Sequence, residues 1–389
     1  MSNKGCATLA AATALSLLGV AAADAGGFSR GTADTDILFE PGNFNARTSI
    51  TVVSPERKIV SGPSNVGHDY ADTYVMPSLA AKFRISDNLS CAGTIANAYG
   101  AASSFDSPRL TAGGTPGQGK LEESFTIMEY GATCAVGFDL NKGRLSILGG
   151  VFVEDFDYDL SVGQMLPLPG TPVVNALGVD LSGTAVGWRA GVAYEIPEIA
   201  LRAQLLYRSG TKIDASGRGN LLVPDVGVVG LGAGGEGKLP QSIEAKFQTG
   251  IAPGWLAYGS VKWTDWSVNR TLTLDVGNGA VQTQNEYYWR DGWTVMGGIG
   301  HSFTDQISGT AFLMWDRGTS TGYDLHGDVV TLGAGLIMKD GFGELRLGGG
   351  VSRVGSVKET AYGDGSSAAN YAVGSGWSVS GLAGYSVKW

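Results

Sequence analysis

Short segments in which polar and apolar residues alternate recur along this 389-residue chain. In residues 201–208 the odd positions are apolar, whereas Arg202, Gln204 and Arg208 occupy even positions. The same pattern occupies residues 75–85, 242–251 and 307–316. Because side chains of a strand point alternately to its two faces, each segment predicts a strand with one apolar face. Alternating segments of about 10 residues are typical of strands that cross a membrane.

The composition agrees with this interpretation. Charged residues make up 16% of the chain, below the roughly 25% of soluble domains. The 61 glycines are also more than usual, and inward-facing glycine leaves room inside a barrel. The net charge of −9 excludes the basic surface of a nucleic-acid-binding protein. After Ala23 no stretch approaches 18 consecutive apolar residues, so any membrane crossing must be made by strands.

The first residues, 1–25, have the features of a secretory signal peptide. Lys4 precedes a mainly apolar run over residues 7–23, and Ala21, Ala23 and Ala25 offer cleavage sites. We expect cleavage near Ala25, so that the mature chain begins near Gly26.

Two cysteines, Cys91 and Cys134, remain in the mature chain and fall on the predicted lipid face. An oxidising compartment permits one disulfide between them. The sequence leaves open whether the strand registers allow it.

Connections between the alternating segments are of two lengths. The short ones are polar and suit tight hairpins: Asp87-Asn88, residues 140–143, Pro197-Glu198, Pro253-Gly254, Asp305-Gln306 and residues 340–343. The long ones, over residues 102–122, 163–182 and 217–240, are predicted loops. This asymmetry is typical of an outer-membrane barrel. From a first strand near residues 48–53 to the last at Trp389, the sequence predicts an all-β, transmembrane antiparallel β-barrel of about 14 strands.

The last strand explains why the chain ends on an aromatic residue. Trp389, Val387 and Tyr385 form its lipid face, and Trp389 belongs to the aromatic girdle at the membrane interface. A terminal aromatic with alternating apolar residues also looks like the signal that the barrel-assembly machinery recognises during insertion. A soluble β-sandwich is the alternative, but the signal peptide and the terminal aromatic oppose it.

Several segments carry a family resemblance. They are "AGGFSRGTADTD" (residues 25–36), "RAGVAYEIP" (189–197), "LLYRSGTKID" (205–214), "LPQSIE" (239–244), "WLAYGSVKWTDWS" (255–267) and "DGWTVMGGIGHSFTDQ" (291–306). In order and content they resemble the outer-membrane long-chain fatty-acid transporters of the FadL type and their relatives for toluene-like hydrocarbons. The resemblance implies a fourteen-stranded barrel with an N-terminal hatch inside its lumen. We therefore expect a signal peptide at 1–25, a hatch or plug at 26–46 and a barrel at 47–389.

The chain departs from the family pattern after the hatch. An Asn-Pro-Ala stretch usual in the family is absent, and Glu40-Pro41-Gly42-Asn43 stands near that place. The family's third strand has a kink that opens the wall sideways into the membrane. Ala92, Gly93 and Gly100 in the expected third strand here would permit one.

Inward-facing cations are the candidates for binding the carboxylate of an amphipathic ligand, since a buried carboxylate needs a charged partner. By alternation Arg189, Arg202, Arg208, Lys212, Lys246 and Lys262 all face inward. Arg208 is the first candidate because it lies deep in its strand within the family motif, followed by Lys262 and Arg189. The alternative is that these cations pair with inward Glu195, Glu244 and Asp139 and only stabilise the lumen. The resemblance also implies that Phe28 plugs or contacts the ligand pocket.

Apolar residues in the long connections predict a landing groove for a poorly soluble substrate. Leu221, Leu222 and Val226 are the candidates in one of them. The connection after Gly163 adds Met165, Leu166, Leu168, Val173, Val174, Ala176 and Leu177. The alternative is that these loops pack on each other or on lipopolysaccharide.

Together these features predict a monomeric outer-membrane channel for passive uptake of long-chain fatty acids, with no cofactor and no metal. The alternatives are uptake of aromatic hydrocarbons, a general aqueous porin, or a lipid hydrolase. No Ser-His pair converges on one face, so we expect no enzyme. We expect a hydrophobic small molecule, outer-membrane lipid with lipopolysaccharide, and the assembly machinery as partners.

Overall fold

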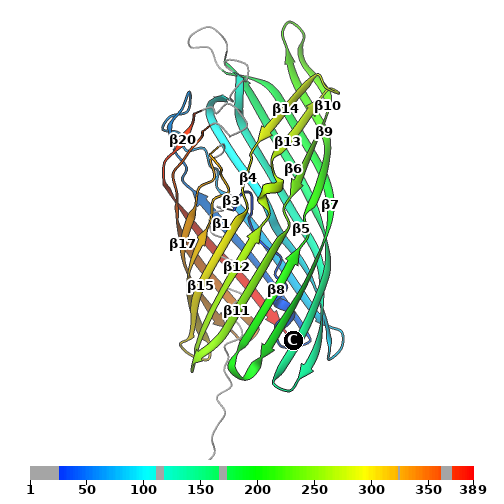
Figure 1. Ribbon diagram of the computed structural model, residues 1–389, viewed down its shortest axis with the longest axis vertical. Helices are drawn as coiled ribbons and strands as arrows, with labels where there is room; N and C mark the ends of the chain where they lie inside the picture. The colour runs from blue at the N-terminus through cyan, green and yellow to red at the C-terminus, as the bar shows by residue number, and fades with distance from the viewer. Residues whose placement is uncertain (1–25, 111–117, 166–172, 323–324, 361–369) are drawn as a thin grey trace, which may run out of the picture.

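The computed structural model describes residues 26–110, 118–165, 173–322, 325–360 and 370–389, which form a closed antiparallel β-barrel of 14 strands (Figure 1). The predicted fold class is therefore confirmed. Four barrel strands are interrupted along their length, so that β8 continues as β9, β10 as β11, β12 as β13 and β14 as β15. A small sheet of β2, β19 and β20 lies outside the barrel sheet.

The barrel is built from the following strands in chain order. They are β1 (Phe44–Pro55), β3 (Tyr74–Arg84), β4 (Leu89–Leu110), β5 (Gln118–Leu140), β6 (Gly143–Gln164), β7 (Val174–Ile196), β8 (Leu201–Arg208), β9 (Thr211–Val223), β10 (Gly227–Leu239), β11 (Ser242–Ala252), β12 (Trp255–Thr264), β13 (Thr271–Val276), β14 (Val281–Glu286), β15 (Gly292–Ser302), β16 (Ile307–Asp316), β17 (Val329–Lys339), β18 (Gly343–Val354) and β21 (Gly376–Lys388). The small sheet comprises β2 (Ile59–Ser61), β19 (Val357–Lys358) and β20 (Ala372–Val373). The short helices are η2 (Thr35–Phe39), η3 (Pro197–Ile199) and η4 (Trp266–Val268).

Pairing of the first strand with the last closes the barrel. β1 and β21 are antiparallel from Asn45↔Lys388 to Pro55↔Ser378. Beyond the strand, the Trp389 amide donates to the Phe44 carbonyl, and the Trp389 carbonyl accepts from the Phe44 and Asn43 amides. No open sheet edge remains at this seam, as lipid requires.

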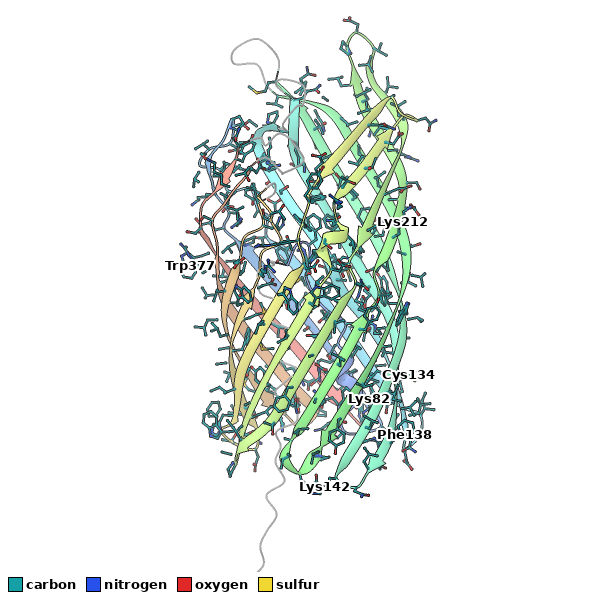
Figure 2. All side chains as sticks on the ribbon, viewed as in Figure 1. Lys82, Cys134, Phe138, Lys142, Lys212 and Trp377 are labelled. Atoms are coloured by element: carbon teal, nitrogen blue, oxygen red, sulfur yellow. A yellow bond between two sulfur atoms is a disulfide. The ribbon has the colours of Figure 1, made fainter. Side chains whose placement is uncertain are left out.

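The predicted alternation is present in the strands. In β3, Val75, Leu79 and Phe83 are about half exposed on the outer surface, whereas Lys82 is 1% exposed inside. Figure 2 shows the side chains of Phe138 and Trp377 on the outside of the wall. Among the described helices, none has the length and apolar character needed to cross a membrane.

The two ends of the barrel differ, as predicted, but the long connections are mostly strand. β4 continues to Leu110, and β9 and β10 form a hairpin that projects beyond the rest of the barrel (Figure 1). The prediction of loops over residues 102–122, 163–182 and 217–240 is therefore wrong for most of the described residues. Their glycine and polar content predicted loops, but paired hairpins outside the lipid tolerate both because no apolar outer face is needed there.

One inward prediction is also wrong, because the alternation shifts between β8 and β9. Arg202 is buried on the inner face of β8, whereas the buried residue of early β9 is Ile213. Lys212 is therefore exposed, and it pairs with Asp214 at 2.8 Å and Glu236 at 3.0 Å. The interruption at Ser209-Gly210 changes the face of every following residue, as a one-residue slip does.

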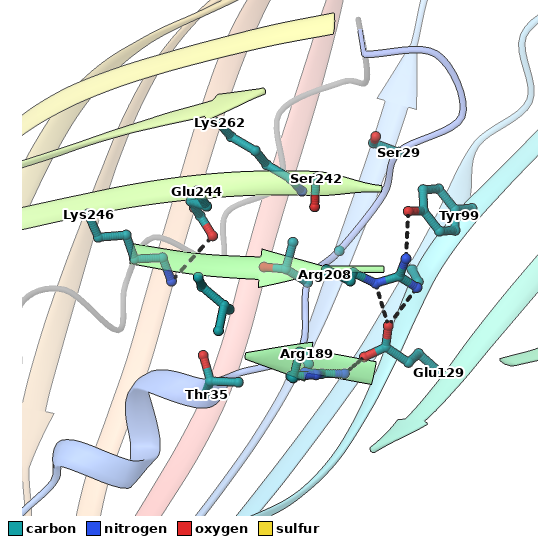
Figure 3. Close-up of a pocket in the computed structure, with 15 residues that line it drawn as sticks. Ser29, Thr35, Tyr99, Glu129, Arg189, Arg208, Ser242, Glu244, Lys246 and Lys262 are labelled. Atoms are coloured by element: carbon teal, nitrogen blue, oxygen red, sulfur yellow. Dashed lines mark hydrogen bonds and ion pairs between the residues drawn. The ribbon is translucent and has the colours of Figure 1, made fainter. Parts of the chain in front are cut away.

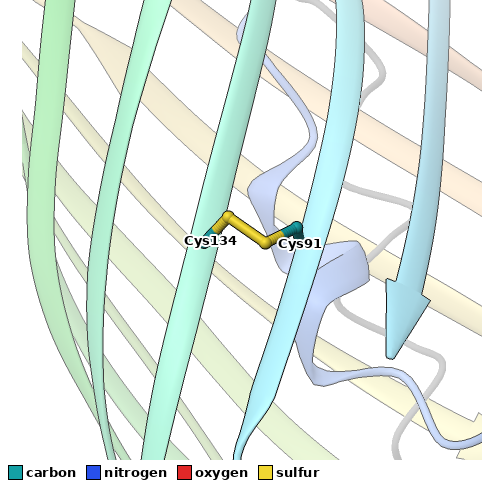
Figure 4. Close-up of a disulfide and its surroundings, with 2 residues drawn as sticks. All are labelled: Cys91 and Cys134. Atoms are coloured by element: carbon teal, nitrogen blue, oxygen red, sulfur yellow. A yellow bond between two sulfur atoms is a disulfide. The ribbon is translucent and has the colours of Figure 1, made fainter. Parts of the chain in front are cut away.

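A disulfide joins Cys91 of β4 to Cys134 of β5 (Figure 4). The two residues are directly paired across the strands, with their Cα atoms 3.9 Å apart. Their neighbours Ala92 and Ala135 are buried on the inner side, so the disulfide lies on the outer face, as the alternation predicted. Register, which the sequence left open, is what permits the bond.

The segment over residues 26–43 lies inside the barrel. Ile37 and Leu38 of η2 are 1% and 6% exposed and pack against small inward residues of the wall, namely Ala80, Ala92, Ala135 and Ala193. Burying two such side chains contributes roughly 1.5–3 kcal/mol each. β1 begins at Phe44, and the expected domain division at residue 46 stays a prediction.

The wall is not continuously paired between β3 and β4. Their ladder ends at Ser78↔Ala96, although both strands continue beyond it. β4 also has an irregularity between Asn97 and Tyr99 in its pairing with β5. The inner segment occupies this place: the Arg30 amide donates to the Ala98 carbonyl at 3.0 Å, and the Gly31 amide to the Asn97 carbonyl at 2.7 Å. The third strand thus exposes backbone groups that the N-terminal segment satisfies.

Candidate functional site

An aromatic pocket surrounds the side chain of Phe28. Rings of five residues lie around it, with centroids at these distances: Trp289 at 4.6 Å, Phe125 at 4.7 Å, Tyr287 at 5.4 Å, His326 at 5.9 Å and Trp266 at 6.0 Å. Four of the five contacts are edge-on, the geometry that aromatic quadrupoles prefer. Ile127, Phe156, Leu181 and Ile213 extend the apolar lining. Phe28 thus lies among aromatic side chains, and its contact with a ligand pocket stays a prediction.

A polar pocket lies beside the N-terminal segment, which contributes Ser29 and Thr35 to its lining (Figure 3). Four cations line it, which are Arg189 of β7, Arg208 of β8, Lys246 of β11 and Lys262 of β12. Two carboxylates, Glu129 and Glu244, also line it. The three predicted cationic site residues, Arg208, Lys262 and Arg189, are thus brought together by neighbouring strands. The pocket suits an anionic group only at a lining cation that is not already paired with an acid.

Two of these cations are already paired with acidic side chains. Arg208 donates to Glu129 at 2.9 and 3.0 Å and also bonds Glu154, and Arg189 bonds the other oxygen of Glu129. Arg208 further donates to the Tyr99 hydroxyl at 3.1 Å. Glu129 and Glu154 are 2% and 0% exposed, so these are buried, multiply bonded pairs.

The acidic partners differ from those expected. Among the described residues, Glu195, Glu244 and Asp139 form no ion pair with Arg208 or Arg189. Asp139 instead pairs with Arg144 at 2.7 Å. Glu244 does pair with one of the expected cations, Lys246, at 3.8 Å. The expectation is wrong for Glu195 and Asp139, which form no ion pair with the inward cations among the described residues. Glu129 and Glu154 on β5 and β6 are the partners of the two arginines instead.

Lys262 is in a different situation. Its side chain lines the polar pocket, but no carboxylate of the described residues lies within 4.0 Å of its amino group. Lys246, by comparison, lies 3.0 Å from Asp36 and 3.8 Å from Glu244. Of the four cations that line the pocket, Lys262 is therefore the one that forms no ion pair with a described residue.

Ion pairs attach the second half of the N-terminal segment to the wall. Asp36 of η2 pairs with Lys246, and Glu40 pairs with Arg47 at 2.7 Å. Lys82 donates to the Glu40 backbone carbonyl. Burial by itself raises the pKa of Asp36, but the cations of Lys246 and Arg202 lower it, and the resulting pKa lies below the usual aspartate value. The carboxylate of η2 is therefore held in its charged form.

The two pockets adjoin, because consecutive residues separate them. Phe28 lines the aromatic pocket and Ser29 the polar pocket. Their cavity volumes are about 80 Å³ and 40 Å³, whereas ligand sites typically measure about 300–1,000 Å³. In this conformation the space for a ligand is filled by the N-terminal segment itself.

The predicted loop residues lie elsewhere. Leu221 is half-buried and packs against the aromatic core of the lumen, but Leu222 and Val226 are 36% and 72% exposed at the end of the β9–β10 hairpin. None of the three lines a pocket described above. In the connection after Gly163, Leu166 and Leu168 lie outside the described residues. The role of these loops in ligand capture stays a prediction.

Sequence reasoning missed several residues of the two pockets. Trp266 and Trp289 pack against the Phe28 ring and each other, and Glu129 and Glu154 pair with Arg208. Trp266 lies in the Trp-Thr-Asp-Trp-Ser segment. There the alternation of polar and apolar residues stops, which could have predicted that Trp266 lies beyond the end of the strand. Among the described residues no cluster of acidic, histidine or cysteine side chains has the arrangement of a metal site.

The fold and the plugged lumen define a class of protein, the outer-membrane transport barrels. Residues 32–317 match the family described as "outer membrane protein transport protein (OMPP1/FadL/TodX)", which covers most of the chain. The chain belongs to this family, which confirms the predicted resemblance, the outer-membrane location and the transport class.

Curated relatives agree with this assignment. The long-chain fatty acid transport protein of Salmonella typhi is 27% identical over 334 residues, which are 72% of each chain. The protein of the same name from Shigella flexneri is 28% identical over 332 residues, covering 72% of this chain and 73% of the relative.

Solved structures show the same fold. A Pseudomonas aeruginosa FadL homologue superposes with a TM-score of 0.67 at 16% identity, covering 90% of this chain and 91% of that one. The Pseudomonas putida toluene transporter TodX gives a TM-score of 0.63 at 13% identity, with 91% and 92% coverage.

Proposed function

We propose that this protein takes up apolar molecules with an acidic head group, namely long-chain fatty acids, by passive diffusion across the outer membrane. The observation that carries the proposal is the pair of adjoining pockets, one aromatic and one polar, at the N-terminal segment. An alkyl chain needs the first and a carboxylate the second. The curated relatives named for fatty acid transport support the same substrate class.

Lys262 is the proposed contact for the ligand's carboxylate. Arg208 and Arg189, the other two candidates, share Glu129, so an entering anion competes there with a buried carboxylate. At Lys262 no such competitor lies within 4.0 Å among the described residues. We assign Arg208 the supporting role of fixing Glu129, Glu154 and Tyr99, and Arg189 that of fixing Glu129.

Substitution of Lys262 tests this assignment. Lys262→Met keeps an unbranched side chain, one atom shorter, and removes its charge. It should weaken binding of a fatty acid by roughly tenfold to a hundredfold, the equivalent of a hydrogen bond to a charged group. Binding of the fatty alcohol of equal chain length should change little. Both are measured on the detergent-solubilised protein by calorimetry.

Lys212→Met is the matched control, because Lys212 is 50% exposed and lies outside both pockets. It should leave both affinities unchanged. Equal losses of acid and alcohol binding in Lys262→Met would remove the carboxylate role from Lys262.

A second candidate substrate class is the aromatic hydrocarbons. The specific observation in its favour is the aromatic pocket, in which the Phe28 ring already occupies a position among five other rings. A toluene-like ring that replaces Phe28 would make the same edge-on contacts. Tighter binding of toluene than of a fatty acid by the wild-type protein would favour this candidate.

The N-terminal segment is the proposed hatch. A ligand reaches a pocket of adequate size only when Phe28 leaves, and the same segment covers the unpaired stretch between β3 and β4. Release of residues 26–31 therefore enlarges the pocket and uncovers the wall together. We propose that the ligand leaves sideways through this stretch into the membrane.

A reversible cross-link tests the movement of the hatch. Ser29 and Tyr99 form an antiparallel bridge, so cysteines at both positions should form a disulfide that holds the segment on β4. Fatty-acid uptake by cells should then be low after oxidation and recover after reduction. The single variants Ser29→Cys and Tyr99→Cys, treated identically, control for loss of the side chains and for reduction of the native disulfide. Undiminished uptake by the oxidised double variant would contradict a moving hatch.

Further partners belong to the same proposal. Trp389 is 72% exposed beside Phe44 at the closing seam, which suits recognition by the barrel-assembly machinery during insertion. The exposed end of the β9–β10 hairpin, including Val226, suits contact with lipopolysaccharide or incoming substrate. A barrel closed by its own first and last strands needs no second copy, so we propose a monomer.

A further inference from the structure

A groove lies on the outer, lipid-facing surface of the barrel wall, outside both pockets of the lumen. It extends over strands β3 to β7 and has a volume of about 470 Å³, within the range of about 300–1,000 Å³ that is typical of ligand sites. None of the described residues that line it is charged. We call it the outer groove, and its apolar lining suits an alkyl chain.

Small side chains form the floor of the outer groove. Ala81, Gly93 and Ala132 are paired in that order across β3, β4 and β5. Ala92 and Thr133, their neighbours in the chain, are 3% and 1% exposed on the inner side, so the floor residues point outward. A Cβ atom added to Gly93 would have no atom within 4 Å, so the floor is open at this point.

Larger side chains form one edge of the outer groove. Leu79, Ile95, Tyr130 and Val153 are paired in that order across β3, β4, β5 and β6. The disulfide between β4 and β5 lies on the same outer face at the other side of the floor (Figure 4). Since neighbouring strands lie about 4.8 Å apart, the five strands span about 19 Å. That length suits a long alkyl chain better than a single aromatic ring.

The edge of the outer groove also borders the unpaired stretch between β3 and β4. The ladder of these strands ends at Ser78↔Ala96, and the adjoining pair, Leu79↔Ile95, lines the groove. On the inner side of the wall, Tyr99 of β4 lines the polar pocket. The four residues from Ile95 to Tyr99 cover at most about 13 Å along the strand. A molecule that leaves the lumen through the unpaired stretch therefore meets the outer groove at once.

The polar pocket lies directly behind the outer groove. Phe152 of β6 is 1% exposed and backs the groove from the inner side. The guanidinium carbon of Arg208, which lines the polar pocket, is 4.2 Å from the centroid of the Phe152 ring. That of Arg189, also in the polar pocket, is 5.0 Å from the same centroid. One layer of strands thus separates the two sites, and the unpaired stretch connects them at one end.

We propose that the outer groove receives the alkyl tail of the transported molecule, which leaves the lumen tail first while its carboxylate is still bound at Lys262. This inference rests on the proposed function, and it adds a second binding place and an order of events. The tail moves from one apolar site to another, so its transfer exposes little apolar surface to water. The carboxylate keeps its cation until the tail is outside, so that step buries no unpaired charge.

The position of the outer groove favours this occupant over a lipid of the bilayer. Its edge borders the unpaired stretch, where a transported molecule emerges. The chains of a bilayer lipid begin instead at a headgroup, and headgroups stay in the polar region at the membrane surface. The described lining offers no charged residue that could hold such a headgroup.

Filling the outer groove tests the proposal. Gly93→Leu should fold, because its side chain enters open space, and it should lower palmitate uptake by cells at least about fivefold. Palmitate affinity of the detergent-solubilised protein, measured by calorimetry, should stay within about twofold of the wild type, since the lumen is unchanged.

Gly149→Leu is the matched control. Gly149 also lies on the outer face with no atom within 4 Å of its added Cβ, but it does not line the outer groove. Uptake and affinity should both stay like those of the wild type.

A second measurement uses the wild type and needs no variant. A fatty acid with a diazirine at the end of its tail is given to cells, irradiated and located by peptide mass spectrometry. Label should appear on the segments that contain Ile95, Tyr130 and Val153, several-fold more strongly than at Leu332, an exposed residue of the outer face of β17. A phospholipid with the same diazirine in one chain should label both surfaces alike.

The possible outcomes separate the outer groove from the proposed function. Normal palmitate binding with undiminished uptake by Gly93→Leu would overturn the groove and leave the proposed function intact. A phospholipid that labels the groove as selectively as the fatty acid does would assign the groove to bilayer lipid and also overturn the proposal. Absence of palmitate binding by the wild type would overturn the proposed function, and the tail-first exit with it.

Discussion

At the scale of single residues, Gly27 decides whether the hatch fits. Its φ of +60° lies in the left-handed region, and an added Cβ would lie 2.7 Å from ring atoms of both Trp266 and Trp289. Glycine alone avoids both the backbone strain and the clash. The close approach explains why Phe28 enters an aromatic pocket built from two tryptophans.

Gly27→Ala should therefore displace Phe28 from the aromatic pocket. We expect a cost of roughly 1–3 kcal/mol from the left-handed backbone, plus the clash with the two rings. Tryptophan emission should shift to longer wavelength as Trp266 and Trp289 become solvated. Gly67→Ala is the control, since Gly67 has a φ of +90° but no atom within 4 Å of its added Cβ. Similar emission shifts in both variants would assign the effect to strain and not to the pocket.

At this scale the sequence predicted side-chain direction better than side-chain partners. Alternation placed Arg208, Arg189 and Lys262 inside correctly, because direction follows from the local period. Their partners could not be predicted in the same way. Glu129 and Glu154 reach Arg208 only because of the stagger between β5, β6 and β8. It places residues that are far apart in the chain at the same level along the barrel axis.

At the scale of elements, η2 is the fixed part of the N-terminal segment. Its carboxylate, Asp36, pairs with Lys246 at 3.0 Å, and its apolar residues pack on alanines of the wall. Residues 26–31 instead use backbone hydrogen bonds and the aromatic pocket. In the proposed movement of the hatch, the helix is therefore the anchor and residues 26–31 are the moving part.

Acid should loosen this anchor. Because the pKa of Asp36 in the folded protein lies below its usual value, its contribution to stability is complete above the unfolded pKa of about 3.9 and is lost as the pH falls through the folded pKa. Hydrogen exchange of the amides in residues 35–40 should be slow from neutral pH down to about pH 4 and accelerate below it, after correction for intrinsic rates.

Asp36→Asn should produce the loosened state already at neutral pH, since it leaves Lys246 without its main partner, a loss of about 3–5 kcal/mol for a buried pair. Asp305→Asn, in an exposed turn, should exchange like the wild type. Unchanged protection of residues 35–40 in Asp36→Asn would show that apolar packing alone holds η2.

The strands themselves show where local patterns stop being sufficient. The segments that cross lipid were predicted well, because one face must be apolar there. The upper parts of β9 and β10 were predicted as loops, because glycine-rich sequence in water has no such requirement. The disulfide between Cys91 and Cys134 depends on the register of β4 against β5, which no single strand encodes.

At the scale of the whole molecule, we expect the barrel to be closed to water-soluble solutes. The two pockets lined by Phe28 and by Ser29 measure about 80 Å³ and 40 Å³, too little for a sugar molecule. We therefore expect passage to require movement of the segment, in contrast to a general porin.

Liposome swelling tests this closure. Wild-type protein should give slow swelling in arabinose, close to that of protein-free liposomes. Deletion of residues 26–33 should increase the rate several-fold, because the pockets lose their common wall while η2 and its ion pair to Lys246 remain. Rapid swelling with the wild type would favour an aqueous porin.

The sequence by itself determined the barrel, its orientation of polar and apolar faces, its short turns and its family, because each of these depends on residues close together in the chain. The tertiary structure alone decided which acids pair with the arginines, that Lys262 keeps an unpaired charge within the described chain, and where Phe28 and Gly26 lie. Those features depend on strand register and on the return of the N-terminal segment into the lumen. Closure of the barrel sets both, and it brings together residues that are far apart in the chain.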